Sequence, residues 1–309
     1  MDIIQVITKE LNVEKWQVEA AVKLIDEGCT IPFISRYRKE ATGSLNDEQL
    51  RTLHERLTYL RNLEEKKNQV LGSIEEQGKL TAELKKQILD AQTLVVVEDL
   101  YRPFRPKRRT RAIIAKEKGL EPLANIIMLQ MTDKPIEEEA QDFVSEEKGV
   151  ETVADAINGA KDIIAEHISD EADYRIYLRK LIMDKGSVAS AAKKPEEASV
   201  YEMYYEFEEP IKKLAGHRVL ALNRGEKEKI LTVKVNAPEE EAMGWLQKQV
   251  ITKENPITKP ILREVVEDSY KRLIAPAIER EIRSDLTEKA EDGAIHVFGK
   301  NLEQLLMQP

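Results

Sequence analysis

Apolar residues recur at intervals of three and four along most of the chain, which is the pattern of helices that are buried on one side. Two short helices are predicted before Gly28. A glycine suits the end of the second helix, and Pro32 suits the first turn of a third helix that Gly43 ends. The order of helix, tight turn and helix predicts a helix-turn-helix-like element at about residues 13–43.

The third of these helices carries both aromatic and basic residues. Phe33 and Tyr37 lie one helical turn apart, and we expect them to hold the helix in the core. The same stretch displays Arg36, Arg38 and Lys39, as a recognition-type helix would.

The next segment predicts one long helix, from Asn46 to about Gln77. Asn46 and Gln49 have the spacing of a helix-capping pair, and apolar residues then recur at helical intervals. Gly78 interrupts the pattern, Thr81 can cap a further helix, and shorter helices reach Leu100.

Two prolines, Pro103 and Pro106, prevent a helix from continuing there. The chain between them is expected to be extended or polyproline-like, and a helix is expected to resume near Thr110. Further amphipathic helices then continue to about residue 185.

The spacing of apolar residues changes in the second part of the chain. Residues 229–236 are β-branched and partly alternating, which predicts a strand, and residues 200–207 are a candidate partner for it. Gly225 is interpreted as a turn before that strand. Gly186 and the small and charged residues of 187–199 predict a joint near 186–200, although part of this stretch suits a short helix.

Helical spacing returns from Pro260, and a last helix is predicted after Gly293. The predicted fold class is therefore mainly α, in two regions. Region 1–190 is multi-helical and contains the helix-turn-helix-like element. Region 191–309 holds a small β hairpin or sheet at about residues 200–236 and long C-terminal helices.

Composition indicates a soluble, cytoplasmic protein. The chain has 309 residues, of which 34% are charged and 5% aromatic. Its single cysteine, Cys29, excludes an internal disulfide and a multi-cysteine zinc module, which fits a reducing compartment. The N-terminus does not have the pattern of a signal or transit peptide, and no apolar run approaches the ~20 residues that span a bilayer.

Positive charge is concentrated in one segment, Arg102–Lys118, which we call the basic segment. It contains eight Lys or Arg residues and one acid, whereas the whole chain carries a net charge of −9. Such a cluster can neutralise phosphates and release counterions. The candidate nucleic-acid-binding residues are therefore Arg102, Arg105, Lys107, Arg108, Arg109 and Arg111, followed by Arg36, Arg38 and Lys39.

Two uses of these cations stay open. They can contact the phosphate backbone of RNA or DNA without reading its sequence, since the scarcity of aromatic residues argues against base stacking as the main binding mode. Alternatively, they pair with the surplus carboxylates of the chain itself and tie the segment to the helical body.

No catalytic group is predicted. The four histidines are dispersed without a metal-binding spacing, no glycine-rich phosphate loop occurs, and the paired acids lie in polar contexts typical of solvated faces. We therefore expect no catalytic residue, metal site, cofactor or small-molecule substrate. A metal-dependent hydrolase is the third hypothesis, which cleavage of nucleic acid by the chain would support.

Four segments resemble a known family. They are PFISRYRKEATGSLND (32–47), VEDLYRPFRPKRRTRAIIAKEKGLEPLA (97–124), HRVLALNRGEKEKIL (217–231) and LIAPAIEREIRSDLTEKAEDGAIHVFGKNLEQLL (273–306). They are similar to the N-terminal half of Tex, a family of bacterial transcription accessory proteins.

The resemblance implies a mostly helical region with a helix-turn-helix-like element. In this family an RNase H-like domain, helix-hairpin-helix units and an S1 domain follow it. It also implies binding of RNA or DNA in transcription or RNA metabolism by the complete protein, no established catalysis, and a protein of the transcription machinery as a further partner. The chain ends about where the RNase H-like domain is expected, so it resembles an N-terminal fragment that lacks the S1 domain. The alternative function is a helical scaffold that docks the downstream domains or a transcription-machinery protein.

Overall fold

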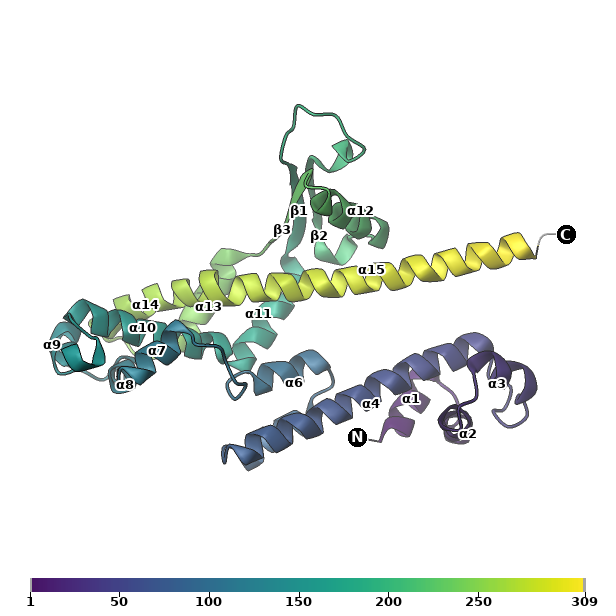
Figure 1. Ribbon diagram of the computed structural model, residues 1–309, viewed down its shortest axis with the longest axis horizontal. Coiled ribbons are helices and arrows are strands. Elements are labelled where there is room, and N and C mark those ends of the chain that lie inside the picture. Colours follow the sequence, from purple (N-terminus) through teal and green to yellow (C-terminus); the bar gives the residue numbers. More distant parts are fainter. Residues whose placement is uncertain (1, 308–309) are drawn as a thin grey trace. The chain divides into compact units, whose positions relative to one another are not determined.

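The structure, a computed structural model, describes residues 2–307 and divides into two compact units, Met1–Arg105 and Pro106–Pro309 (Figure 1). We call them unit 1 and unit 2 and describe each separately. The outermost residues of the two predicted regions, 1 and 308–309, lie outside the described part. The division into regions 1–190 and 191–309 stays a prediction, and residue 190 lies inside unit 2.

Unit 1 is helical, and its longest helix forms its centre. One side of α4 buries a row of apolar residues from Leu50 to Ile74, and each of the other helices of the unit contacts it. The helices are α1 (Ile3–Leu11), α2 (Lys15–Asp26), α3 (Ile31–Tyr37), α4 (Asp47–Glu76), α5 (Ala82–Asp90) and α6 (Leu94–Tyr101).

The predicted long helix is confirmed, together with its cap. The backbone N–H of Gln49 donates to Oδ1 of Asn46 at 2.8 Å, and the N–H of Asn46 donates to Oε1 of Gln49 at 3.0 Å. These two bonds satisfy backbone donors that the first turn leaves without partners. The helix then runs for 30 residues, as far as Glu76.

The helix after Pro32 is shorter than predicted, because the chain turns back after Tyr37. The N–H of Thr42 donates to the carbonyl of Arg38 at 3.2 Å, and the N–H of Ser44 donates to that of Lys39 at 2.7 Å. Helices α2 and α3 do follow one another and touch. Recognition of DNA by this pair stays a prediction.

Unit 2 packs its helices around α10. Helices α7, α8, α9, α11 and α14 all contact it, and its buried residues include Ile163, Ile164 and Ile168. The helices are α7 (Arg111–Glu117), α8 (Glu121–Leu129), α9 (Ile136–Gln141), α10 (Val153–Asp170), α11 (Ala172–Lys185), α12 (Gly216–Lys227), α13 (Glu239–Val250), α14 (Thr258–Asp268) and α15 (Ala275–Leu306).

The small sheet has three antiparallel strands in the order β2-β1-β3: β1 (Ser187–Ala192), β2 (Glu206–Pro210) and β3 (Leu231–Asn236). The strand predicted at 229–236 is confirmed. The pairing expected between 200–207 and 229–236 is wrong, because β1 lies between β2 and β3. Segment 187–192 is thus the central strand rather than a joint or a short helix. Its residues are small, and three successive ones, Val188, Ala189 and Ser190, are buried, so they show no alternation that would reveal a strand.

Two glycines lie inside helices, contrary to the prediction from the sequence. Gly225 lies inside α12 rather than in a turn, where an added Cβ would lie 2.6 Å from Cδ1 of Leu231, so its small size lets β3 pack closely. The last helix does not begin after Gly293, because α15 passes through that residue without a break (Figure 1). A single glycine inside a helix costs about 1 kcal/mol, which a 32-residue helix tolerates.

Within residues 2–307, no helix has both the length and the apolar character required to cross a bilayer.

Candidate nucleic-acid interface

The basic segment runs from the end of α6 through α7, and the division between the two units falls inside it, after Arg105. On the unit 1 side, the N–H groups of Phe104 and Arg105 both bond to the carbonyl of Tyr101, at 2.9 and 3.0 Å. Pro103 therefore lies in a turn, and the extended chain predicted there begins only at Pro106.

On the unit 2 side, the chain from Pro106 to Thr110 forms a loop that leads into α7. Oγ1 of Thr110 accepts a hydrogen bond from the N–H of Ile113 at 3.1 Å, which caps the helix. The helix predicted to resume near Thr110 is thus confirmed. We call residues 106–111 the arginine loop.

Lys107 anchors the arginine loop to α10. Its ammonium donates a hydrogen bond to the carboxylate of Asp170 and lies 3.4 Å from Oε2 of Glu166. The side chains of Lys107, Asp170 and Glu166 are only 22%, 12% and 19% exposed. Water therefore screens their attraction less than it would at an open surface. This cation is engaged internally, as the alternative interpretation of the segment expects.

The arginines of the loop are exposed. Arg108 forms no ion pair or hydrogen bond with any residue that the structure describes. Arg109 lies 3.1 Å from Oε2 of Glu117, but the two side chains are 71% and 56% exposed, and such a pair contributes about 0–1 kcal/mol. Both guanidinium groups are therefore accessible to an external anion.

Arg111 is also exposed, and its charge acts on Asp162, which is half-buried. Burial raises the pKa of Asp162, whereas the positive charges of Arg272 and Arg111 act in the opposite direction. Arg272 makes the direct contact, with Nη2 at 3.2 Å from Oδ1 of Asp162. Arg111 thus influences Asp162 only through its charge.

The two unit 1 arginines of the segment are less free. Arg105 is exposed but lies 3.8 Å from Oε2 of Glu98, which also pairs with Lys66 at 2.5 Å. Arg102 is half-buried. That the arginines on either side of the division contact phosphate stays a prediction.

Arg36, Arg38 and Lys39 are exposed at the end of α3 and in the following turn. The expectation that Phe33 and Tyr37 hold this helix in the core is wrong, because their side chains are 38% and 70% exposed. Ile34, the fully buried residue of α3, is the actual anchor. A seven-residue helix presents few positions to a core, and here one apolar residue fills that role.

The exposed aromatic pair is the feature that sequence reasoning missed. The centroids of the Phe33 and Tyr37 rings lie 5.4 Å apart, and Cζ of Arg38 lies 5.6 Å from the centroid of Phe33. The sequence did contain a signal for this pair. Two aromatic residues lie among cations in a short helix, and one aliphatic residue, Ile34, is sufficient to anchor that helix.

A buried cationic cluster in unit 2 was also missed. Arg175 is fully buried, with Nη2 at 2.5 Å from Oε1 of Glu281, and Arg179 donates to Oε2 of the same residue at 2.6 Å. Two arginines four residues apart in an apolar stretch were the signal for it. The cluster joins α11 to α15 and is structural.

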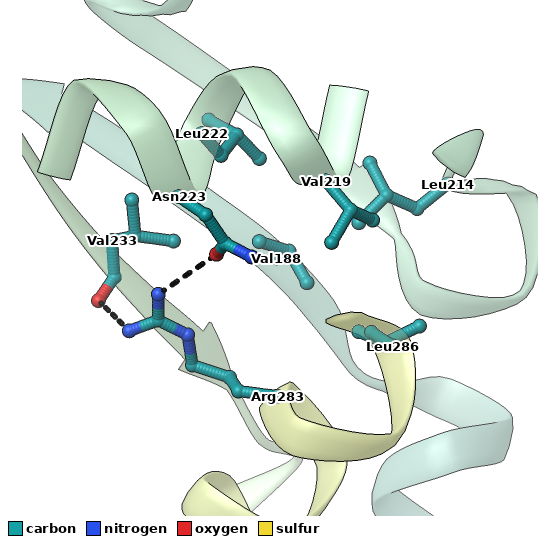
Figure 2. Close-up of a pocket in the computed structure, with 8 residues that line it drawn as sticks. All are labelled: Val188, Leu214, Val219, Leu222, Asn223, Val233, Arg283 and Leu286. Atoms are coloured by element: carbon teal, nitrogen blue, oxygen red, sulfur yellow. Dashed lines mark hydrogen bonds between the residues drawn. The ribbon is translucent and has the colours of Figure 1, made fainter. Parts of the chain in front are cut away.

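A small cavity lies where α12, β1, β3 and α15 meet (Figure 2). Arg283 lines one side of it and donates hydrogen bonds to the carbonyl of Val233 and to Oδ1 of Asn223, both at 3.4 Å. The same guanidinium donates to Glu226 and thereby holds the pKa of that carboxyl below its usual value. The cavity measures about 10 Å³, which is on the order of the space for one water molecule and excludes a substrate.

Among the described residues, no three His, Cys, Asp or Glu side chains are grouped so that they could hold a metal ion.

Two family models match the chain. The Tex-like protein N-terminal domain matches residues 1–75, and the Tex central region matches residues 131–298. The basic segment lies between the two matched ranges.

Curated relatives match nearly the whole chain. Protein YdcI of Bacillus subtilis is 50% identical over 308 residues, which cover 99% of this chain and 43% of the relative. The transcriptional accessory protein Tex of Neisseria gonorrhoeae is 37% identical, covering 99% of this chain and 41% of that protein. Human S1 RNA-binding domain-containing protein 1 is 32% identical, again over 99% of this chain and over 32% of its own length.

The chain thus spans less than half the length of these relatives. Because the central-region model by itself matches more than half of the residues, the chain belongs to the Tex family of transcription accessory proteins.

Proposed function

We propose that this chain is a non-catalytic helical module that holds nucleic acid by its phosphate backbone, within a protein of transcription or RNA metabolism. The observation that carries the proposal is the arginine loop, in which Arg108 has no partner among the described residues and Arg109 and Arg111 are exposed. Guanidinium groups bind phosphate oxygens with two parallel hydrogen bonds, and each neutralised phosphate releases counterions.

The loop is suited to this task because it is both anchored and open. Lys107 fixes its beginning on α10 through Asp170 and Glu166, and the Thr110 cap fixes its end on α7. The arginines between these points lose less freedom on binding than they would on an unanchored chain. Arg102, Arg105 and the cations near α3 are proposed as further phosphate contacts.

RNA and DNA are both candidate partners. One relative is named for an S1 RNA-binding domain and another as a transcriptional accessory protein, which supports an association with nucleic acid and with the transcription machinery. Contacts to phosphates carry no sequence information, so we propose binding without sequence readout.

The test is charge reversal at two adjacent arginines, Arg108→Glu with Arg109→Glu. Binding of labelled RNA and duplex DNA is measured by fluorescence anisotropy between low and moderate salt. We expect affinity at low salt to fall at least about tenfold and the slope of log affinity against log salt to decrease by about two, one for each lost phosphate contact. An unchanged affinity at low salt would show that the loop is not the binding site.

The matched control is Lys85→Glu with Lys86→Glu. These residues are also an adjacent, exposed pair of cations, and they form no ion pair with a described residue. The control changes the net charge by the same amount, so a loss of affinity as large as that of the arginine variant would indicate an effect of overall charge alone.

A scaffold that docks the downstream domains or a transcription-machinery protein is the second candidate function. It is favoured by Lys107, whose charge is satisfied internally. If Arg108 and Arg109 served the fold in the same way, their reversal would lower the melting midpoint and leave nucleic-acid binding unchanged. Metal-dependent cleavage of nucleic acid by the chain would contradict the non-catalytic proposal.

A further inference from the structure

Two aromatic rings stand exposed on α3 of unit 1. Phe33 and Tyr37 are 38% and 70% exposed, and their ring centroids are 5.4 Å apart with planes inclined by 44°. Exposed apolar surface is unfavourable in water, at about 25 cal/mol per Å². A pair of neighbouring exposed rings therefore indicates a surface that a binding partner covers.

Cations surround the pair. At about 100° per residue, Arg36 projects about 60° to one side of Phe33, on the side away from Tyr37. Arg38 places its guanidinium carbon 5.6 Å from the centroid of Phe33, and Lys39 follows in the turn. Arg36 and Lys39 form no ion pair with any described residue. Glu40 is the one acid in residues 30–44, against three cations.

Residues of α2 hold the turn that follows α3 in place. Nε2 of Gln17 donates to the carbonyls of Thr42 and Gly43 at 3.2 and 2.9 Å. The ring of Trp16 packs where Gly43 has no side chain, since a Cβ there would lie 2.5 Å from Cη2 of Trp16. Together with the buried Ile34, these contacts make the aromatic and basic residues a preformed surface.

We infer that Phe33 and Tyr37 form a stacking site for unpaired bases of single-stranded nucleic acid, with Arg36, Arg38 and Lys39 contacting the adjacent phosphates. Ring faces recognise base faces, which are free only where the strand is unpaired. A peptide of acidic residues alone would satisfy the cations but would leave the rings uncovered. The inference deepens the proposed function, since it adds a base-dependent site on unit 1 to the charge-dependent loop of unit 2.

The experiment separates bases from phosphates. Anisotropy is measured with a labelled oligothymidine and with an abasic oligonucleotide of the same length and charge. We expect the chain to prefer oligothymidine and Tyr37→Ala to lower that affinity by about tenfold, with abasic binding nearly unchanged. Tyr37→Trp should keep the preference, because it restores a ring.

The matched control is Phe298→Ala. Phe298 is an aromatic residue of α15 that is exposed to a similar extent, 68%. Its substitution should leave both affinities unchanged. Tyr37 is mostly exposed, so its truncation should not alter the melting midpoint, and Phe33→Leu provides a second variant that keeps an apolar side chain.

The outcomes are distinguishable from those of the proposed function. Equal losses for both oligonucleotides in Tyr37→Ala, or equal binding of both by the parent chain, would overturn the stacking site and leave the arginine loop unaffected. Conversely, loss of the base preference in Tyr37→Ala with no effect of the Arg108 and Arg109 reversal would overturn the loop proposal alone.

Discussion

Two basic stretches of this chain look alike in sequence and differ in their surroundings. In the arginine loop of unit 2, Lys107 binds two carboxylates of α10, and its arginines are exposed to solvent. The cations near α3 in unit 1 form no ion pair with a described residue and flank two exposed rings. The difference teaches that clustered positive charge does not specify its use, because neighbouring carboxylates and rings decide that.

The largest expected effect contrasts the same substitution in the two stretches. Lys107→Met removes a largely buried cation that contacts both Asp170 and Glu166, which should lower the free energy of unfolding by about 3 kcal/mol. Lys39→Met removes a cation that has no described partner and should change it by less than about 0.5 kcal/mol. Denaturant unfolding measures both. Equal values would mean that Lys107 contributes no more to the stability of its loop than Lys39 contributes to that of its turn.

A smaller effect tests the support of the turn after α3. Gly43 has φ +60° and its missing side chain leaves room for Trp16, so Gly43→Ala should cost about 2 kcal/mol through backbone strain and displacement of that ring.

Gly28 offers the matched control. It also has a positive φ, +84°, but a Cβ there would meet nothing within 4 Å, so Gly28→Ala should cost only the strain of about 1 kcal/mol. Thermal unfolding compares the two variants. If Gly28→Ala were the more destabilising, the contact with Trp16 would not be what holds the turn.

The smallest effect concerns Arg111, whose charge opposes the burial that raises the pKa of Asp162. Arg111→Gln should raise this pKa further, because it removes a positive charge that opposes the effect of burial, whereas Arg36→Gln in unit 1 should not. Carbon-detected NMR titration of the carboxyl group measures the pKa directly.

The sign of the stability effect follows from the same shift. Because the pKa of Asp162 in the folded state lies above the ordinary 3.8, the folded chain binds this proton more tightly than the unfolded chain does. The corresponding stabilisation is complete below pH 3.8 and is lost as the pH rises through the folded-state pKa. An unchanged titration in Arg111→Gln would mean that Arg111 has no internal role.

Elements that depend on nearby residues were predictable. The cap of α4, the strand β3 and the restart of a helix at Thr110 each follow from spacing or capping within a few residues. The central strand β1 was not predictable, because its residues are small and the two strands that pair with it are supplied only by the fold. The helical position of Gly225 was likewise not predictable, because the reason for a glycine there is the close packing of Leu231, which only the fold shows.

The candidate site divides in the same way. Sequence alone determined that cations gather at 102–118 and at 36–39, and that prolines keep part of the first stretch out of a helix. Only the tertiary structure decided which cation is internal, because the carboxylate that binds Lys107 lies 63 residues away along the chain. It also decided that Ile34 rather than Phe33 or Tyr37 anchors α3, since burial depends on which side of a short helix meets α4, and helical spacing by itself does not contain that information.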